Sequence, residues 1–333
     1  NSTSDEGNAV IYMLFIDEGS DGWSDVGDLV KIDTGIGGVS NPNGISDVRA
    51  VDLDGNGTVD RIYAGDLLGN LHVVDVSSPN QTSWDDAGNK FILYKAKYSQ
   101  TSEEQPITTR PIVVNNERGA GLVVVFATGR FFAVADAVDP RIQSIYGVID
   151  DLSNTEVSAD ELTEQVLTNE VFQLNADESI DVRVLTDNTV SNKGWFIDFD
   201  VLDSSGSFVE FPGEKAIRNL QLRGDNVFAN TIIPLALSCE SPSGGFSLAL
   251  DPQTGTAGNV EIFDFNIDGE FDSEDSIIVQ NVKKIIVGSR FDSSPLDSTF
   301  FNDYRITQMS DTSVDSIRVN TEANQALLGL SLI

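Results

Sequence analysis

The chain alternates short apolar runs with clusters of Gly, Asp, Asn and Ser. Runs of this length, bounded by turn-forming residues, predict strands and hairpins rather than helices. The clearest runs cover residues 10–16, 29–33, 61–65, 70–76, 122–129, 130–136, 195–203, 226–234, 245–251 and 283–289.

Three longer units repeat one order of features: a turn rich in Gly, an apolar strand, and then Asp. They read "YAGDLLGNLHVVDV", "FATGRFFAVADAV" and "SPSGGFSLALDPQTG". Units that recur at intervals of some tens of residues are typical of the blades of a β-propeller. The sequence therefore predicts an all-β fold, a β-propeller, with a β-sandwich or irregular hairpins as the alternatives.

Residues 158–167, "SADELTEQVL", form the one stretch with a helical pattern. Ser158 and Glu161 have the spacing of a capping box, and three apolar residues fall on one helix face. We expect one short helix here, inside an inserted helical or loop segment over residues 151–180. Residues 1–333 as a whole are expected to form a single β-propeller domain or its C-terminal portion.

The charge of the chain is strongly negative, with 53 acidic residues against 20 basic ones and a formal net charge of -33. Such a field repels nucleic acid and anionic membranes and favours divalent cations. The acidic residues are spread among strands and turns, which predicts a solvated acidic surface. We expect no nucleic-acid partner and no direct membrane insertion, since no apolar run is long enough to span a bilayer.

Histidine and cysteine occur once each, as His72 and Cys239. Histidine-based zinc sites, Ser-His-Asp triads and Cys-His pairs each need a histidine beside its partner, so these site types are almost excluded. Cys239 is either a free thiol or pairs with a cysteine outside this chain. Neighbouring carboxylates such as Asp85 and Asp86 are expected by chance in so acidic a chain, and we assign them no catalytic role.

Residues 52–60, "DLDGNGTVD", have the ligand spacing of a calcium loop and are called loop 1 below. Calcium takes about six to eight oxygen ligands. An EF-hand loop supplies them from positions 1, 3, 5, 7 and 9 or 12, with Gly at position 6. Gly57 is at position 6, and Tyr63 at position 12 cannot act as the usual acidic ligand, so Asp60 closes the loop and a hairpin can frame it. The predicted ligands are Asp52, Asp54, Asn56, Asp60 and the backbone carbonyl of Thr58.

Residues 264–275, "DFNIDGEFDSED", are a second candidate and are called loop 2 below. Gly269 is at position 6, and the predicted ligands are Asp264, Asn266, Asp268, the Glu270 carbonyl, Asp272 and Asp275. The alternative for both loops is an acidic turn without metal, since Asp, Asn and Gly favour turns. Magnesium fits less well because it prefers fewer protein ligands. The expected cofactor is therefore Ca2+, with a role in folding and rigidity.

Several segments, in their order, resemble the C-terminal domain of the PilY/PilC family, the tip-associated adhesins of type IV pili. They are "NGISDVRAVDLDGNGTVDRIYAGDLLGNLHVVDV", "QPITTRPIV", "VFATGRFF", "QSIYGVID", "GWFIDF", "GEKAI" and "CESPSGGFSLALDPQTG", and they cover about residues 10–275. His72 stands where the family usually has Trp, and Ala127 where it usually has Gly. The resemblance implies the C-terminal blades of a modified, seven-bladed propeller, with further blades upstream.

The resemblance also implies a binding and assembly protein without catalysis. Its calcium at loop 1 would regulate pilus extension and retraction, and hence twitching motility. The implied partners are minor pilins at the pilus tip and a host or environmental surface receptor. The implied location is extracellular, at the cell surface or pilus, after transit through the periplasm.

Two other functions are compatible with the same sequence. A quinoprotein-dehydrogenase-like propeller enzyme has a similar Gly-Asp-x-x-Gly-x-Leu order and a calcium ion beside its cofactor, and a bound quinone would identify it. A passive surface module would use calcium for stability only, and a pilus phenotype would argue against it.

The tripeptide Arg223-Gly224-Asp225 is one that integrins recognise, and family members have been associated with integrin binding through such a tripeptide. Gly-Asp is also a favoured hairpin turn, and strand-like runs flank it here. The sequence predicts a hairpin turn at this position.

Overall fold

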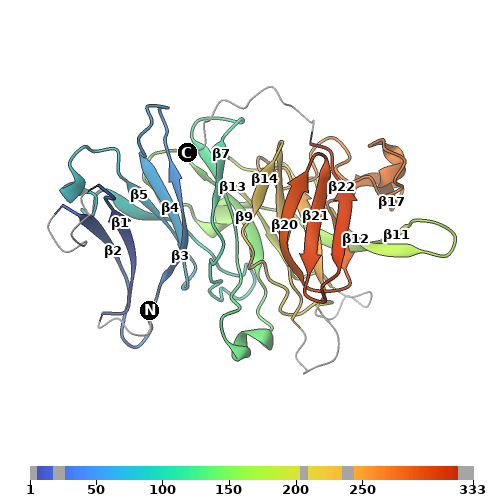
Figure 1. Cartoon of the computed structure of the whole chain (residues 1–333), viewed down its shortest axis with the longest axis horizontal. Helices are drawn as coiled ribbons and strands as arrows, with labels where there is room; N and C mark the ends of the chain where they lie inside the picture. Colours follow the sequence, from blue (N-terminus) through green and yellow to red (C-terminus); the bar gives the residue numbers. More distant parts are fainter. Residues whose placement is uncertain (1–5, 18–26, 203–208, 235–243, 322–333) are drawn as a thin grey trace.

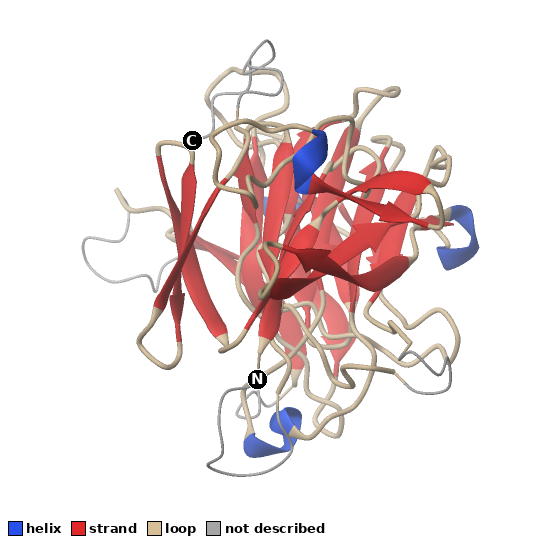
Figure 2. Cartoon of the chain, turned by 90° about the vertical axis from the view of Figure 1, so that its right-hand side faces the viewer, coloured by secondary structure: helices blue, strands red, loops and turns tan. Residues whose placement is uncertain are grey.

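The computed structural model describes residues 6–17, 27–202, 209–234 and 244–321 of the chain. Regular structure in these ranges is almost all strand, and the expected all-β class is confirmed (Figures 1 and 2). The helical residues there form single 3-10 turns: η2 (Gln81–Ser83), η3 (Val134–Ala137), η4 (Ala159–Glu161) and η5 (Ser273–Asp275).

The described strands form sheets that follow one another along the chain, and Figure 1 shows them arranged in series along the long axis of the molecule. A hairpin of β1 (Asn8–Leu14) and β2 (Leu29–Gly37) comes first. The four-stranded sheet then contains, in spatial order, β3 (Ile45–Val51), β4 (Arg61–Asp66), β5 (Asn70–Asp75) and β6 (Lys90–Lys95).

Two larger sheets form the middle of the molecule. The five-stranded sheet contains, in spatial order, β10 (Thr163–Glu164), β13 (Gly194–Asp198), β9 (Ser144–Asp150), β8 (Leu122–Ala127) and β7 (Ile112–Asn115). The six-stranded sheet contains β11 (Leu167–Gln173), β12 (Ser179–Leu185), β19 (Gly288–Phe291), β16 (Gly245–Leu250), β15 (Asn226–Asn230) and β14 (Gln221–Arg223).

Two small sheets complete the described chain. A hairpin pairs β17 (Ser276–Val279) with β18 (Val282–Ile285). The C-terminal sheet has three antiparallel strands, β20 (Pro295–Phe301), β21 (Tyr304–Met309) and β22 (Val314–Arg318).

Strand β8 shows why the sheets stack face to face. All its side chains are buried, and successive side chains of a strand point to opposite faces. Val123, Val125 and Ala127 pack between the five- and six-stranded sheets, whereas Val124 and Phe126 pack between the five- and four-stranded sheets. A strand that is apolar on both faces needs a cover on each side, so β8 lies in a central layer.

The same alternation repeats at the outer layers. Ile62 and Val74 of the four-stranded sheet pack against Ile11 of the first hairpin. Phe228 of the six-stranded sheet packs on its other side toward Phe300 of the C-terminal sheet. Each sheet is therefore covered by the next one along the chain, which is the propeller-like arrangement that the sequence predicts.

The helix expected over residues 158–167 is reduced to the single 3-10 turn η4. The Glu161 carboxylate accepts a hydrogen bond from the Ser158 N–H at 2.8 Å, so the capping contact forms without a helix behind it. Leu162 is buried against the five-stranded sheet, and Leu167 already begins β11. Tertiary packing overrides the weak helical pattern, because these apolar residues are covered by different sheets.

The strand predicted over residues 130–136 is wrong. The chain leaves the sheet after Ala127 and forms a loop that ends in η3. The Asp136 carboxylate accepts from the N–H groups of Phe132 and Ala133 at 2.8 and 2.9 Å and from Arg130 Nε at 2.9 Å. These bonds satisfy the backbone locally and leave Phe132 exposed, so the apolar run does not reach a sheet.

Candidate metal centre

Loop 1 closes the hairpin of β3 and β4 in the four-stranded sheet. Val51 and Arg61 pair across the two strands, and the Asp60 N–H donates to the Val51 carbonyl at 2.9 Å. Strand structure therefore ends and restarts on either side of residues 52–60. The loop is framed by a hairpin, as its sequence predicts.

Backbone N–H groups fix the acidic side chains of loop 1. The Asp52 carboxylate accepts from the N–H groups of Gly57 at 2.7 Å and Gly55 at 2.8 Å, and Asp60 Oδ2 accepts from the Leu53 N–H at 2.7 Å. Gly57 has a φ of 88°, in the left-handed region that a side chain would strain. The hydrogen bonds from these N–H groups, that of Gly57 above all, lower the pKa of Asp52.

The carboxylates of loop 1 converge. One oxygen each from Asp52, Asp54 and Asp60 lies within 4.8 Å of the other two, and no other three His, Cys, Asp or Glu side chains in the described ranges come this close. Asn56 and Thr58 lie in the same turn, where the Thr58 N–H donates to Asn56 Oδ1 at 2.8 Å. Three gathered carboxylates repel one another, and calcium prefers such oxygen donors, so these residues fit a calcium ion.

Loop 2 lies at the other end of the long axis, between the six-stranded sheet and β17 (Figure 1). Before and inside it, Phe263 and Phe265 pack into the core on the outer face of the six-stranded sheet. Phe263 forms a bridge with Val319, and the Asp264 N–H donates to the Arg318 carbonyl at 3.2 Å. The start of loop 2 is thus bonded to the end of the C-terminal sheet.

The first and last acidic side chains of loop 2 are buried: Asp264 is 4% exposed and Asp275 is 2% exposed. Asp275 Oδ1 accepts from the Phe265 N–H at 2.7 Å, and Asp264 Oδ2 accepts from the Gly269 N–H at 3.1 Å. Burial raises the pKa of Asp275, and the charge of Asp264 adds to this. The remaining predicted ligands are exposed on the loop: Asn266, Asp268, Glu270 and Asp272.

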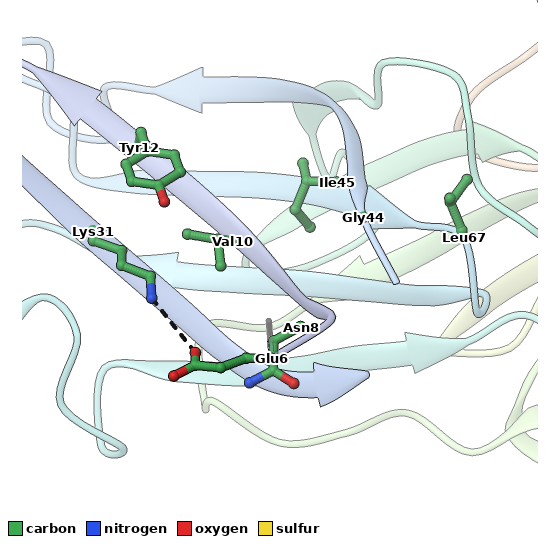
Figure 3. Close-up of a pocket in the computed structure, with 8 residues that line it drawn as sticks. All are labelled: Glu6, Asn8, Val10, Tyr12, Lys31, Gly44, Ile45 and Leu67. Carbon is green, nitrogen blue, oxygen red and sulfur yellow. Dashed lines mark ion pairs between the residues drawn. The ribbon is translucent and has the colours of Figure 1, made fainter. Parts of the chain in front are cut away.

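A separate depression of about 380 Å³ opens beside the first hairpin. Figure 3 shows its lining residues, which are Glu6, Asn8, Val10, Tyr12, Lys31, Gly44, Ile45 and Leu67. Lys31 and Glu6 form an ion pair of 3.8 Å across it. No residue of either acidic loop is among these lining residues, so the depression is not part of the candidate metal centre.

A buried polar cluster around Asp66, the last residue of β4, is absent from the sequence prediction. The Asp66 carboxylate accepts from Asn43 Nδ2 and from the Asn70 N–H at 2.8 Å each, and it lies 2.7 Å from His72 Nε2. The single histidine therefore pairs with a structural carboxylate and belongs to neither acidic loop. The stretch "GDLLGNLH" contains three residues of this cluster, Asp66, Asn70 and His72, so part of it could be predicted from local sequence. Asn43 comes from a remote segment and could not.

The remaining sequence predictions have simple outcomes. Gly224 and Asp225 form a two-residue turn between β14 and β15, with Arg223 paired to Asn226, so the predicted hairpin is confirmed. Cys239 lies outside the described residues. Within the described ranges, no helix is long and apolar enough to cross a membrane.

Comparison with known proteins gives consistent matches. A family model of the PilY1 beta-propeller domain matches residues 1–183. The type IV pilus biogenesis factor PilY1 of Pseudomonas aeruginosa strain PAO1 is 29% identical over 268 residues, which are 70% of this chain and 22% of that protein. A PilY1 homolog of Xylella fastidiosa is 29% identical over 224 residues, which are 65% of this chain and 14% of that protein. The chain thus spans less than a quarter of the length of these relatives.

The crystal structure of the Pseudomonas aeruginosa PilY1 C-terminal domain is similar in fold. The TM-score is 0.67 at 24% identity, over 88% of this chain and 66% of that one. The family model covers more than half of the chain, and the solved domain is similar in fold. The chain belongs to the PilY1 β-propeller domain family.

Proposed function

We propose that this chain is a calcium-binding β-propeller that acts in type IV pilus biogenesis, and that calcium in loop 1 controls how firmly the β3–β4 hairpin is ordered. The proposal is carried by the convergence of Asp52, Asp54 and Asp60 within 4.8 Å. The family and the names of its relatives, which are type IV pilus biogenesis factors, supply the pilus context.

The position of loop 1 suits a sensor of external calcium. Asp54 and Asn56 are exposed, whereas Asp60 is buried at the foot of β4, so an ion here would join the solvent side of the loop to the strand. Calcium sites in extracellular modules often have Kd values of about 10⁻⁴ to 10⁻³ M. A site of this strength would fill and empty as the calcium outside the cell changes.

The finer parts of the proposal follow from the family resemblance. Ordering of loop 1 would affect contacts with minor pilins at the pilus tip, and through them the balance of pilus extension and retraction. The chain would also bind a receptor on a host or environmental surface, in an extracellular, pilus-associated position. We assign no catalytic residue.

Calorimetry with calcium tests the metal site directly. The chain with wild-type loop 1 should bind calcium, and Asp60→Ala should lose one binding event. The matched control is Asp86→Ala, which removes an exposed carboxylate outside both loops. An Asp60→Ala variant that binds as many calcium ions as the control would rule out the loop 1 site.

A cellular assay tests the link to the pilus. Asp60→Ala and Asp86→Ala are introduced into the gene that encodes this chain, and surface pili and twitching motility are compared at low and high calcium. We expect calcium-dependent motility in the control and altered, calcium-independent motility in Asp60→Ala. Equal motility, with calcium binding lost, would leave only a stabilising role for the ion.

A further inference from the structure

The Asp264 carboxylate has an oxygen that the fold does not satisfy. Oδ2 accepts from the Gly269 N–H at 3.1 Å and lies 3.5 Å from Arg318 Nη1. Oδ1 is fully buried, and no donor in the described part of the chain reaches it. Buried polar atoms almost always have a partner, and an exception points to a bound water or ion. The unsatisfied oxygen belongs to a carboxylate that is turned into loop 2.

The backbone of loop 2 follows that of loop 1 position by position. The N–H at position 6 donates to the carboxylate at position 1 in both loops, from Gly57 to Asp52 at 2.7 Å and from Gly269 to Asp264 at 3.1 Å. The two glycines have φ values of 88° and 89°. The bonds from position 5 to position 3 and from position 7 to position 5 also recur. The two loops therefore share the same backbone turn over positions 1–7, although among the described residues only loop 1 brings three carboxylates within 4.8 Å of one another.

The loops differ in the residue that closes them. In loop 1 the N–H at position 2, from Leu53, donates to Asp60 at position 9. In loop 2 the corresponding N–H, from Phe265, donates to Asp275 at position 12. Position 12 is the closing ligand of an EF-hand loop. Asp275 therefore closes loop 2 at position 12, as Asp60 closes loop 1 at position 9.

The charge of loop 2 is only partly compensated. Six acidic side chains lie between residues 264 and 275. Arg318 contacts the loop through the Gly269 carbonyl and Asp264, but its Nε is bonded to Asp303. One shared guanidinium cannot balance this cluster, so a divalent cation would lower its energy.

We propose that loop 2 is a second calcium site and that its ion holds the C-terminal sheet against the six-stranded sheet. Its ligands are Asp264 through Oδ1, Asn266, Asp268, the Glu270 carbonyl and Asp275. Asp272 caps η5, where its Oδ1 accepts from the Glu274 N–H at 2.7 Å, and stands at the position that often binds through water.

The coupling to the C-terminal sheet follows from the hydrogen bonds around Asp264. Its N–H donates to the Arg318 carbonyl, and the Asn320 N–H donates to the Ile262 carbonyl at 2.8 Å. An ion that fixes Asp264 therefore also fixes the end of β22, to which the Asp264 backbone is bonded. This site does not depend on loop 1.

Calcium calorimetry on the full chain, after treatment with a chelator, tests the stoichiometry. We expect two calcium ions on the wild type, one on Asp60→Ala, one on Asp264→Asn and none on the double variant. Two calcium ions on Asp264→Asn, as on the wild type, would overturn the proposal. Whether Asp60→Ala loses a calcium ion tests loop 1 alone. Asn266→Ala, at an exposed position that no core contact needs, should weaken one of the two sites by about tenfold.

Hydrogen exchange tests the coupling and does not rely on binding heats. At about ten times Kd, calcium should slow exchange of the β20–β22 amides by about tenfold in the wild type and in Asp60→Ala. It should leave these amides unchanged in Asp264→Asn. Equal protection of β20–β22 in the wild type with calcium and with chelator would contradict the proposed link.

Discussion

Loop 1 and loop 2 share a turn but place it in different surroundings. In loop 1 three carboxylates gather at a mostly exposed hairpin tip. In loop 2 the first and last carboxylates, Asp264 and Asp275, are buried, and the side chain of Arg318 lies against the loop. On the proposals above, the turn that the loops share over positions 1–7 would serve an exposed site in loop 1, which exchanges its ion with solvent, and a half-buried site in loop 2, which fastens two sheets. Burial and the position of the closing carboxylate, 9 in loop 1 and 12 in loop 2, separate the two loops.

The arginines near the two loops differ in the same way. Arg61 directly follows loop 1, but its Nη1 pairs with Asp150 of the five-stranded sheet at 2.5 Å, and both side chains are buried. The Tyr63 hydroxyl donates to the same carboxylate at 2.7 Å. Arg318, in contrast, is 28% exposed and contacts loop 2 itself. The strand that follows loop 1 is therefore anchored by a buried ion pair that includes no loop 1 ligand, whereas loop 2 has no buried pair of this kind among its described contacts.

The largest effect is expected from breaking the frame of loop 1. Arg61→Met leaves the Asp150 carboxylate buried and unpaired, which should lower the free energy of unfolding by about 3–5 kcal/mol. Urea unfolding with calcium and with chelator should give the same loss, because the pair is separate from the loop 1 ligands. A loss under about 1 kcal/mol, or one that calcium restores, would show that the frame depends on the ion.

Calcium should stabilise the two ends of the molecule separately. At about a hundred times Kd, an ion that binds only the folded state adds about 3 kcal/mol to the free energy of unfolding. Asp60→Ala should lose this gain at loop 1 and keep the gain at loop 2, and Asp264→Asn should do the reverse. Urea unfolding of both variants, followed by tryptophan fluorescence and by exchange in β20–β22, separates these gains. Loss of both gains in either variant would mean that the loops act as one site.

A buried carboxyl group in the five-stranded sheet should make the free energy of unfolding depend on pH, independently of both loops. Burial raises the pKa of Asp198 to about 6, although Ser144 and Ser99 donate hydrogen bonds to it. In the unfolded chain its pKa is about 3.9, so the folded state holds an extra proton between pH 4 and 6. The stability from this group is therefore full below about pH 4 and is lost as the pH rises through 6.

Asp198→Asn removes this titration. Relative to the variant, the wild type should lose about 3 kcal/mol of unfolding free energy between pH 3 and 7, from a pKa shift of about two units at about 1.4 kcal/mol each. Thermal or urea unfolding in chelator at several pH values gives the slope. Asp86→Asn, at an exposed carboxylate that does not act on Asp198, is the control, and an unchanged slope in Asp198→Asn would assign the pH dependence to other groups.

Strands that are buried on both faces could be predicted from the sequence alone. β4, β5, β8 and β16 begin at the residues where their apolar runs begin, because each run fills two cores and its few polar side chains, such as His72 and Ser247, are buried with it. The ligand spacing of both loops is local as well. A turn of this kind depends on residues a few positions apart, so the sequence alone indicates it.

The rest depended on residues that are distant in sequence. Arg61 and Asp150, or Arg318 and Asp264, are partners only because separate sheets meet, and no local pattern indicates such pairs. The apolar run that ends at Asp136 reads as a strand until its carboxylate is seen to cap the preceding turn. Burial of Asp264 likewise follows from the C-terminal sheet that covers it, and not from its own loop.

The smallest effect is expected at Arg318, where one substitution should lower stability without calcium and raise the calcium affinity of loop 2. Without calcium, Arg318→Met should lower the free energy of unfolding only slightly, because the Arg318 side chain and its partner Asp303 are partly exposed to solvent. With calcium, the same change should raise the affinity of loop 2 by about three- to tenfold, since a cation beside Asp264 repels the ion. Calorimetry on an Asp60→Ala background isolates the loop 2 site. A fall in affinity would instead make Arg318 the group that holds loop 2 open for calcium through the Gly269 carbonyl.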